Sequence, residues 1–205
     1  MKSTKLLLVI ALGLLLTSSG YAQKVKLISG KLDFLKGQKA LKLQYTYDGM
    51  SVGKFDKEED YLAKKVADYN EKEAGKGDKW AESWKADRDK RFEPSFEQML
   101  TEQLSSKEIT EIGEDVDAPY TMIIRTKRTE PGFNVYVTRK YAEIDGIVEF
   151  VETANPDKVL ATIEFEKMPG RTYGGYDFDT GVRLSEAYEK AAKDIGKFLV
   201  KNALK

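Results

Sequence analysis

Hydrophobic and polar residues alternate with a period of two along the first part of the chain. The alternation is clearest over residues 41–47, where leucines and tyrosines are separated by polar side chains, the pattern of a half-buried β-strand. Residues 25–35 have a looser strand character, and residues 36–38 supply a turn between the two segments. The folded part of the chain is therefore expected to begin with two strands.

Residues 56–106 change to a helical period and form a predicted helical block. The first helix is expected to follow Asp56 as its N-cap, and the second to follow Asp78. Pro94 either stops that second helix or starts the third, because proline is tolerated in a first helical turn. The third helix then carries a hydrophobic stripe from Phe96 to Leu104.

Three more strands are expected downstream, at residues 120–129, 135–151 and 159–165. Hydrophobic alternation indicates them, and turn sequences rich in glycine, proline and asparagine separate them. The second strand is long and carries Asp145-Gly146, which predicts a bend or a β-bulge at that point. Consecutive strands joined by short turns indicate an antiparallel meander.

The last segment has the strongest helical pattern in the chain. Between Leu184 and Leu199, hydrophobic residues recur every three or four positions, which predicts an amphipathic helix that runs to the C-terminus. Ile195 on this helix and Leu100 on the third helix of the block both belong to hydrophobic stripes. We expect both side chains to be buried.

The order of these elements predicts an α+β fold. Groups of strands with helices between them favour a mostly antiparallel sheet of about five strands, with helices packed on one face. Residues 23–205 are long enough to bury a core as a single domain. The helical block at residues 56–106 would then lie between the two groups of strands.

The first 22 residues are expected to be a secretory signal peptide. Lys2 and Lys5 give a positive start, residues 6–16 are an apolar run, and small residues stand three and one positions before Gln23. The apolar run is short for a membrane-spanning helix. The mature chain is therefore expected to begin near Gln23 and to be exported, to the periplasm or alternatively to the extracellular space.

The absence of two residue types narrows the possible chemistry. The chain contains no histidine and no cysteine, which excludes Ser-His-Asp triads, Cys-His pairs, disulfides and the usual zinc sites. A hydrolase would have to use paired carboxylates or a Ser-Lys pair. Because no catalytic motif stands out, we expect no enzymatic activity, no cofactor and no metal.

The charge of the chain restricts its expected partners. It has 34 basic and 34 acidic residues, interspersed along the sequence, so it lacks the basic surplus typical of nucleic-acid-binding proteins. No membrane-spanning segment is expected after removal of residues 1–22. The expected partner is a protein or a glycan of the cell envelope.

Part of the chain resembles a known class of domain. Residues 120–126 (YTMIIRT) and 130–133 (EPGF) lie in a strand-turn-strand-strand-helix order that covers residues 95–205. This order resembles the small exported α/β domains of diderm envelopes, the TolB amino-terminal domain and CsgG-like domains. The resemblance is architectural and implies a role in building or serving an envelope assembly. It carries over no functional residue, and the chain lacks the lipidated cysteine and evident pore-forming hairpins of CsgG.

Two regions carry side chains suited to recognition. The glycine- and tyrosine-rich loop at residues 170–181 combines backbone freedom, an arginine and rigid aromatic surface, although a connector before the last helix has the same composition. Two tryptophans one helical turn apart suit either sugar stacking or a core-facing stripe. The candidate binding residues are Arg171, Tyr173, Tyr176, Asp177, Asp179, Trp80 and Trp84.

Asp179-Thr180-Gly181 matches the short signature of aspartic proteases. That chemistry needs two carboxylates that share one proton, and the chain has one such triplet. An N-cap of the last helix at Asp179 or Thr180 explains the same residues without catalysis. A calcium loop counted from Asp177 would need a glutamate at its twelfth position, which Tyr188 occupies.

The sequence thus favours a non-enzymatic binding or assembly component of the cell envelope. Two other interpretations stay open: a carboxylate-dependent hydrolase that uses Asp177 and Asp179, and a carrier of a small ligand between helices and sheet. A hydrolase predicts a concave pocket holding carboxylates of raised pKa. A carrier predicts an apolar cavity, and a binding protein predicts an exposed apolar patch.

Overall fold

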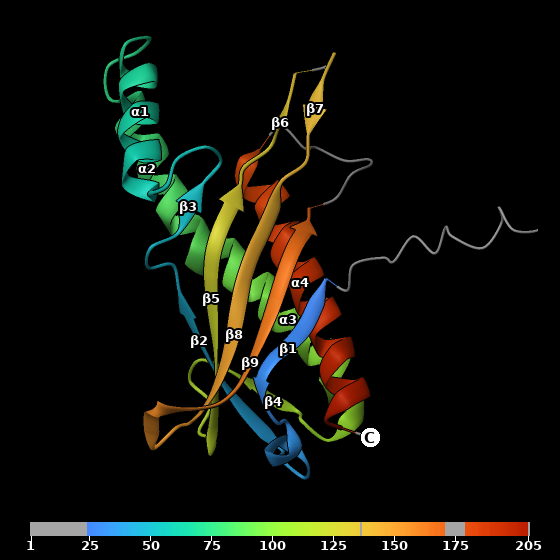
Figure 1. Ribbon diagram of the computed structural model, residues 1–205. Helices are drawn as coiled ribbons and strands as arrows, with labels where there is room; N and C mark the ends of the chain where they lie inside the picture. Colours follow the sequence, from blue (N-terminus) through green and yellow to red (C-terminus); the bar gives the residue numbers. More distant parts are fainter. Residues whose placement is uncertain (1–23, 136, 171–178, 205) are drawn as a thin grey trace, which may run out of the picture.

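The structure, a computed structural model, describes residues 24–135, 137–170 and 179–204 (Figure 1). The expected signal peptide at residues 1–22 lies outside the described residues. The strands are β1 (Val25–Gly30), β2 (Ala40–Thr46), β3 (Ser51–Val52), β4 (Glu111–Gly113), β5 (Tyr120–Glu130), β6 (Phe133–Asn134), β7 (Arg139–Lys140), β8 (Glu143–Glu152) and β9 (Asn155–Pro169). The α-helices are α1 (Glu58–Asn70), α2 (Lys76–Asp87), α3 (Glu93–Leu104) and α4 (Thr180–Asn202). The short helical turns are η1 (Asp33–Leu35), η2 (Arg88–Phe92) and η3 (Ser105–Lys107).

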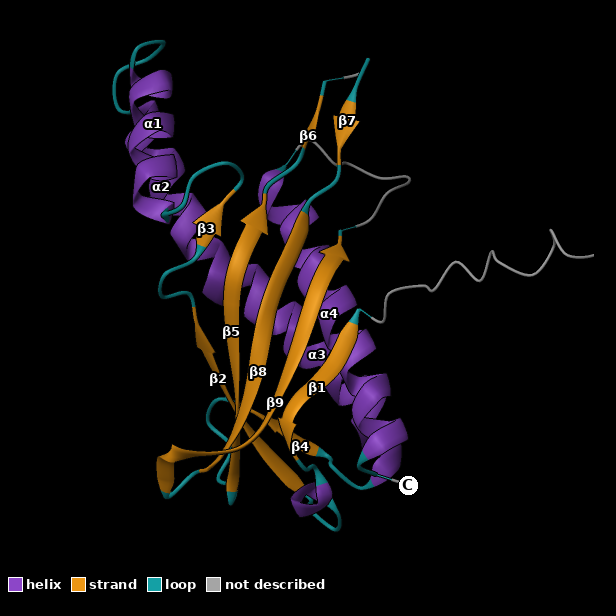
Figure 2. Cartoon of the chain, viewed as in Figure 1, coloured by secondary structure: helices purple, strands orange, loops and turns teal. Residues whose placement is uncertain are grey.

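One sheet of seven strands forms the body of the protein, in the order β1-β9-β8-β5-β2-β4, with β3 beside β5. The pairs β1–β9, β9–β8 and β8–β5 are antiparallel, whereas β5–β2, β2–β4 and β3–β5 are parallel. The helices α3 and α4 lie across one face of this sheet (Figure 2). The expected α+β class is therefore confirmed.

The expectation of about five mostly antiparallel strands is wrong in number and in direction. β3 and β4 have two and three residues, too few to show an alternating pattern. The helical block carries the chain back to the end of the sheet at which β2 begins, so β4 and β5 run parallel to β2. The two short strands β3 and β4, which the sequence pattern did not indicate, and the crossover through the helical block thus produce a mixed sheet of seven strands.

Residues 135–151 do not form the single long strand that was expected. β8 begins at Glu143, and the residues before it belong to a separate two-stranded hairpin, β6–β7. This hairpin projects from the same end of the sheet as α1 and α2 (Figure 1). The irregularity expected at Asp145-Gly146 is confirmed, because the register of β8 against β9 shifts between Ile144 and Gly146.

The helices α2 and α3 are joined by η2, a π-helical turn, into one continuous helical path. Pro94 lies in the first turn of α3, where its ring crowds the carbonyl four residues earlier, that of Lys90. The preceding turn widens instead, and the N–H of Glu93 donates to the carbonyl of Arg88, five residues back. Pro94 therefore lies at the start of α3, as the second of the two expected alternatives stated. It does not interrupt the continuous helix formed by α2, η2 and α3.

The helices α3 and α4 pack against each other as well as against the sheet. Leu100 of α3 and Ile195 of α4 are fully buried, as predicted. Gly196 lets the two helices approach closely, because a methyl group there would lie 2.5 Å from the Cβ of Gln103. The core is therefore a sandwich of one sheet face and two touching helices.

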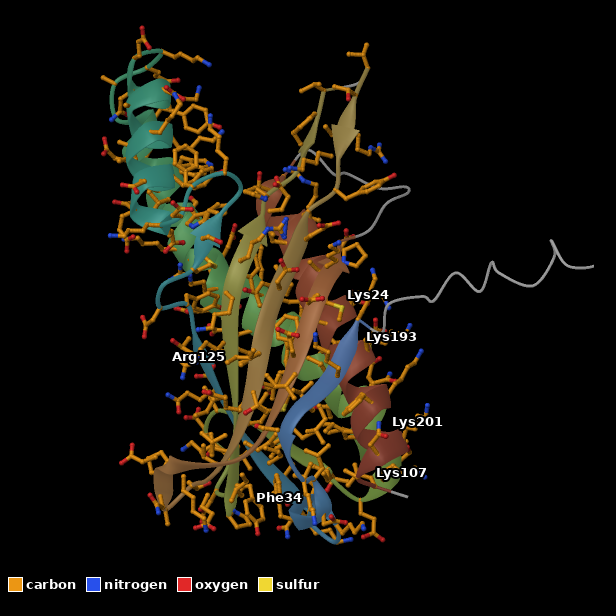
Figure 3. The ribbon with its side chains drawn as sticks, viewed as in Figure 1. Lys24, Phe34, Lys107, Arg125, Lys193 and Lys201 are labelled. Carbon is orange, nitrogen blue, oxygen red and sulfur yellow. The ribbon has the colours of Figure 1, made fainter. Side chains whose placement is uncertain are left out.

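Replacing Leu100 or Ile195 by aspartate places a carboxylate among fully buried apolar side chains. We expect each variant to lose about 3–5 kcal/mol of the free energy of unfolding, measured by urea denaturation. Lys193→Asp puts the same side chain at an exposed position of α4 (Figure 3) and should change it by about 0.5 kcal/mol or less. Unchanged stability in both core variants would contradict the helix faces described here.

Candidate functional site

An open groove with a volume of about 970 Å³ lies between α3 and the edge strand β4. Half of the residues that line it are acidic and none of them is basic. The lining residues are Asp89, Glu93, Pro94, Glu97, Gln98, Thr101, Glu102, Ile112, Gly113, Glu114, Asp115 and Val116. We name this site the acidic groove.

The helical period of α3 separates its acidic residues from its apolar ones. Glu93 and Glu97, four residues apart, line the groove, whereas Phe96 and Leu100 are fully buried beneath the helix. The opposite wall is β4, which ends at Gly113. A methyl group at Gly113 would lie 3.4 Å from the carboxylate oxygens of Glu97, so this carboxylate reaches across the groove to the strand.

The electrostatics of the groove raise the pKa of two carboxyl groups. Burial raises the pKa of both Glu93 and Glu97. The neighbouring carboxylates of Glu114 and Asp115 raise the pKa of Glu97 further. The hydroxyl of Tyr47 donates to Oε1 of Glu93 at 3.0 Å and opposes the rise there without cancelling it. The groove thus concentrates negative charges that repel one another.

Such a groove is suited to two kinds of chemistry. It attracts a positively charged group, whose arrival relieves the repulsion between the carboxylates. A carboxyl group of raised pKa in a concave site can also exchange protons with a substrate. Among residues 24–135, 137–170 and 179–204, no three carboxylates are placed so that they could hold a metal ion.

Four of the binding residues predicted from the sequence, Arg171, Tyr173, Tyr176 and Asp177, lie outside the described residues. Their role in recognition stays a prediction. The fifth loop residue, Asp179, is described, and it does not line the acidic groove.

Asp179 is the N-cap of α4, the first of the two positions, Asp179 and Thr180, that the sequence left open. Its Oδ1 accepts a hydrogen bond from the N–H of Gly181 at 2.7 Å, and its Oδ2 accepts one from Nη1 of Arg91 at 2.9 Å. Partial burial would raise the pKa of Asp179, but Arg91 and the backbone N–H groups outweigh it and lower that pKa. An ionised, paired carboxylate is poorly suited to donate a proton in catalysis.

The two tryptophans belong to an aromatic cluster at the contact of α1 and α2. Trp84 is buried, and its Nε1 donates to Oε1 of Glu58 at 2.6 Å. Trp80 is partly buried and meets Tyr61 and Tyr69 edge-on, with ring centroids 5.8 and 5.6 Å apart. The core-facing alternative is therefore correct for Trp84. Because its side chain is buried, Trp84 offers no surface to a ligand.

The acidic groove was not predicted from the sequence. Two signals were present: glutamates four residues apart at Glu93 and Glu97, and a run of acidic residues within 108–117. Only the pairing of β4 with β2 brings that run beside α3. A three-residue strand gives no periodic signal from which this pairing could be predicted.

Comparisons with known proteins assign no family. No protein-family model matches the chain, and no curated protein matches it. Among solved structures, a PelC dodecamer from Paraburkholderia phytofirmans is similar with a TM-score of 0.38 and 10% identity, over 83% of this chain and 96% of that one. A variant of the same protein gives a TM-score of 0.35 and 10% identity, over 81% and 94%. The resemblance to TolB and CsgG domains stays a prediction.

Removing the N-cap of α4 should measurably destabilise the protein. We expect Asp179→Ala to lower the free energy of unfolding by about 1 kcal/mol at pH 7, measured by urea denaturation. Because the pKa of Asp179 is lowered in the folded state, this contribution is present above its ordinary value of 3.8 and is lost as the pH falls through the folded-state pKa. Asp179→Asn keeps a capping oxygen and should lose less. An equal loss in both variants would assign the effect to the charge pair with Arg91.

Neutralising one wall of the groove should stabilise the protein. Because the pKa of Glu97 is raised in the folded state, its ionised form costs stability above that pKa, and the cost disappears below the ordinary value of 4.5. We expect Glu97→Gln to raise the melting temperature at pH 7 by about 1–2 °C, and by less as the pH approaches 4.5.

The matched control for this measurement is Glu189→Gln, which removes an exposed carboxylate on α4 outside the groove. Its melting temperature should stay close to that of the parent at both pH values. A lower melting temperature for Glu97→Gln than for the parent at pH 7 would show that this carboxylate stabilises the fold rather than straining it.

Proposed function

We propose that the chain is a non-enzymatic binding protein of the cell envelope whose acidic groove holds a positively charged segment of a partner. The observation that carries this proposal is the single sign of charge in the groove, where six residues are acidic and none is basic. A positively charged group is the ligand that such a surface attracts and orients. It would also relieve the repulsion from Glu114 and Asp115, which adds to the larger effect of burial in raising the pKa of Glu97.

The walls of the groove favour a lysine-rich segment over a simple ion. Pro94, Ile112 and Val116 add apolar surface between the carboxylates. The aliphatic part of a lysine side chain can pack on such surface while its ammonium group meets a carboxylate. The volume of about 970 Å³ is sufficient for several side chains. We therefore propose a basic protein segment as the ligand, with an amino-bearing glycan as the alternative.

The proposed location outside the cytoplasm rests on the first 22 residues. A positive start, an apolar run at residues 6–16 and small residues before Gln23 are typical of a cleaved secretory signal. We propose the periplasm as the place of action. The lack of histidine and cysteine and the balanced charge support a binding role over common enzymatic roles or nucleic-acid binding.

A fluorescently labelled octalysine peptide tests the groove by anisotropy titration. We expect the parent protein to bind it at low ionic strength and to bind it more weakly as salt is added. The double variant Glu114→Gln/Asp115→Asn removes two exposed charges from the groove. It should bind about fivefold more weakly, the loss expected for two exposed ion pairs.

The matched control is the double variant Glu71→Gln/Glu73→Gln, which removes two exposed acids beside the α1–α2 pair and outside the groove. It should bind the peptide as the parent does. Equal weakening in the two double variants, or parent-like binding by the groove variant, would overturn the proposal. Binding of chitosan oligomers without binding of octalysine would assign the groove to a glycan partner.

A carboxylate-dependent hydrolase is the second candidate, favoured by the raised pKa of Glu93 and Glu97 in a concave site. These residues suit that role better than Asp179, whose pKa is lowered. Turnover of model glycosides or esters by the parent, lost in Glu97→Gln, would support this candidate. If no substrate is turned over while octalysine still binds, the binding role stands.

A further inference from the structure

Two tyrosines hold Glu93, a wall residue of the acidic groove, at both its backbone and its side chain. Tyr45 lies in β2 and Tyr47 directly follows this strand, a spacing that puts both side chains on the face of the buried Leu43. The hydroxyl of Tyr45 donates to the main-chain carbonyl of Glu93 at 3.3 Å, and that of Tyr47 donates to its Oε1 at 3.0 Å. The sheet thus fixes both the backbone and the carboxylate of this residue.

The ring of Tyr47 is itself held in place from its other side. The guanidinium of Arg88 in η2 lies over the ring, 4.1 Å from its centroid. Nη2 of Arg88 donates to both carboxylate oxygens of Glu58 in α1, at 2.5 and 2.6 Å. Because this pairing fixes the plane of the guanidinium, Arg88 acts as a plate under the ring. The hydroxyl of Tyr47 is therefore aimed in one direction, at Glu93.

Glu93 and Glu97 both line the groove, but only one of them has this support. In the part of the chain that the structure describes, Tyr47 is the only side chain that hydrogen-bonds the carboxylate of Glu93, and none does so for Glu97. A hydrogen bond from a fixed donor favours the ionised form of a carboxyl group and one orientation of it. Glu93 is therefore preorganised to meet a cation, whereas Glu97 is not.

The donor stays protonated wherever the carboxylates titrate, because burial raises the pKa of Tyr47 far above its ordinary value of 10. Burial also raises the pKa of Glu93, and the hydrogen bond from Tyr47 lowers it in part. Two other acids raise this pKa further, one arginine lowers it, and one more tyrosine faces the same carboxyl group. These four are Asp89 and Arg88 of η2, Glu114 beyond β4 and Tyr188 of α4. Removing the hydroxyl of Tyr47 leaves all four in the chain.

We propose that Tyr47 is a positioning residue that makes Glu93 the anchor carboxylate of the acidic groove, held ionised and oriented for an ammonium group of the ligand. This role rests on the proposed function and adds a dependence on pH to it. Because the hydrogen bond favours the ionised form, Glu93 loses its charge at a lower pH than it would without Tyr47. The groove consequently keeps a basic ligand further into the acidic range.

The pH dependence of octalysine binding tests this role. Anisotropy titrations of the parent and of Tyr47→Phe are made at constant ionic strength between pH 7 and the ordinary glutamate pKa of 4.5, a range in which the lysines of the peptide stay charged. At pH 7 we expect Tyr47→Phe to bind about threefold more weakly, the factor for a long side chain that binding must now immobilise. The ratio to the parent should grow as the pH falls, because the variant protonates Glu93 first.

Tyr45→Phe is the matched control. It removes the same group two residues away, but the lost hydrogen bond ends on the main-chain carbonyl of Glu93 and not on the carboxylate. It should therefore keep the pH profile of the parent, and thermal unfolding of both variants shows whether they are folded. A ratio between Tyr47→Phe and the parent that is the same at every pH would reduce Tyr47 to a packing role and overturn the proposal. The same pH-dependent loss in Tyr45→Phe would also overturn it.

A second readout needs no ligand. The NMR chemical shift of the Glu93 side-chain carboxyl carbon, assigned with Glu93→Gln, is followed as the pH is lowered. We expect its midpoint at a higher pH in Tyr47→Phe than in the parent, and no change in Tyr45→Phe. Octalysine that binds the parent while this midpoint is the same in Tyr47→Phe overturns the anchor role alone. Octalysine that fails to bind the parent at any pH overturns the proposed function, and the anchor role with it.

Discussion

Burial of one hydrophobic face of the central sheet is the constraint on which the rest of the structure depends. Phe150 and Phe165, on the neighbouring strands β8 and β9, are fully buried with Ile195 of α4. Covering this face takes two helices side by side, and Gly196 allows their close contact. Their positions then determine the acidic groove and the base of the β6–β7 hairpin. α3 forms a wall of the acidic groove, and α4 supplies Arg183 at the base of the projecting hairpin.

The opposite face of the sheet is built from charged pairs between neighbouring strands. Arg125 of β5 pairs with Glu149 of β8 at 3.0 Å, and Arg128 pairs with Asp145 at 2.8 Å (Figure 3 labels Arg125). Partly exposed pairs of this kind each contribute about 0.2–1 kcal/mol. Their larger effect is on register, because a slip of one residue would turn these charges toward the core and the core residues toward water.

The parts of the fold with a sustained hydrophobic period were predictable from the sequence. α4, the stripe that contains Leu100 and the strands around residues 41–47 and 120–129 all follow from spacing alone. Strand direction was not predictable in this way, because alternation is the same in parallel and antiparallel pairs and the helical crossover decides between them. The acidic groove could not be predicted from the sequence for a related reason. Glu97 and Glu114 meet only because β4, too short to be recognised, pairs beside β2.

The pairing of β1 with β9 has a consequence for how the chain folds. Val25 lies opposite Phe165, so this pairing joins the first strand of the sheet to the last, and such distant contacts form slowly. α4, which completes the core, comes after every described strand of the sheet in the chain. A nascent chain therefore cannot close its core until residues 180–202 have been synthesised. For a protein with the export proposed here, that delay keeps the polypeptide extended and able to pass through a translocation channel.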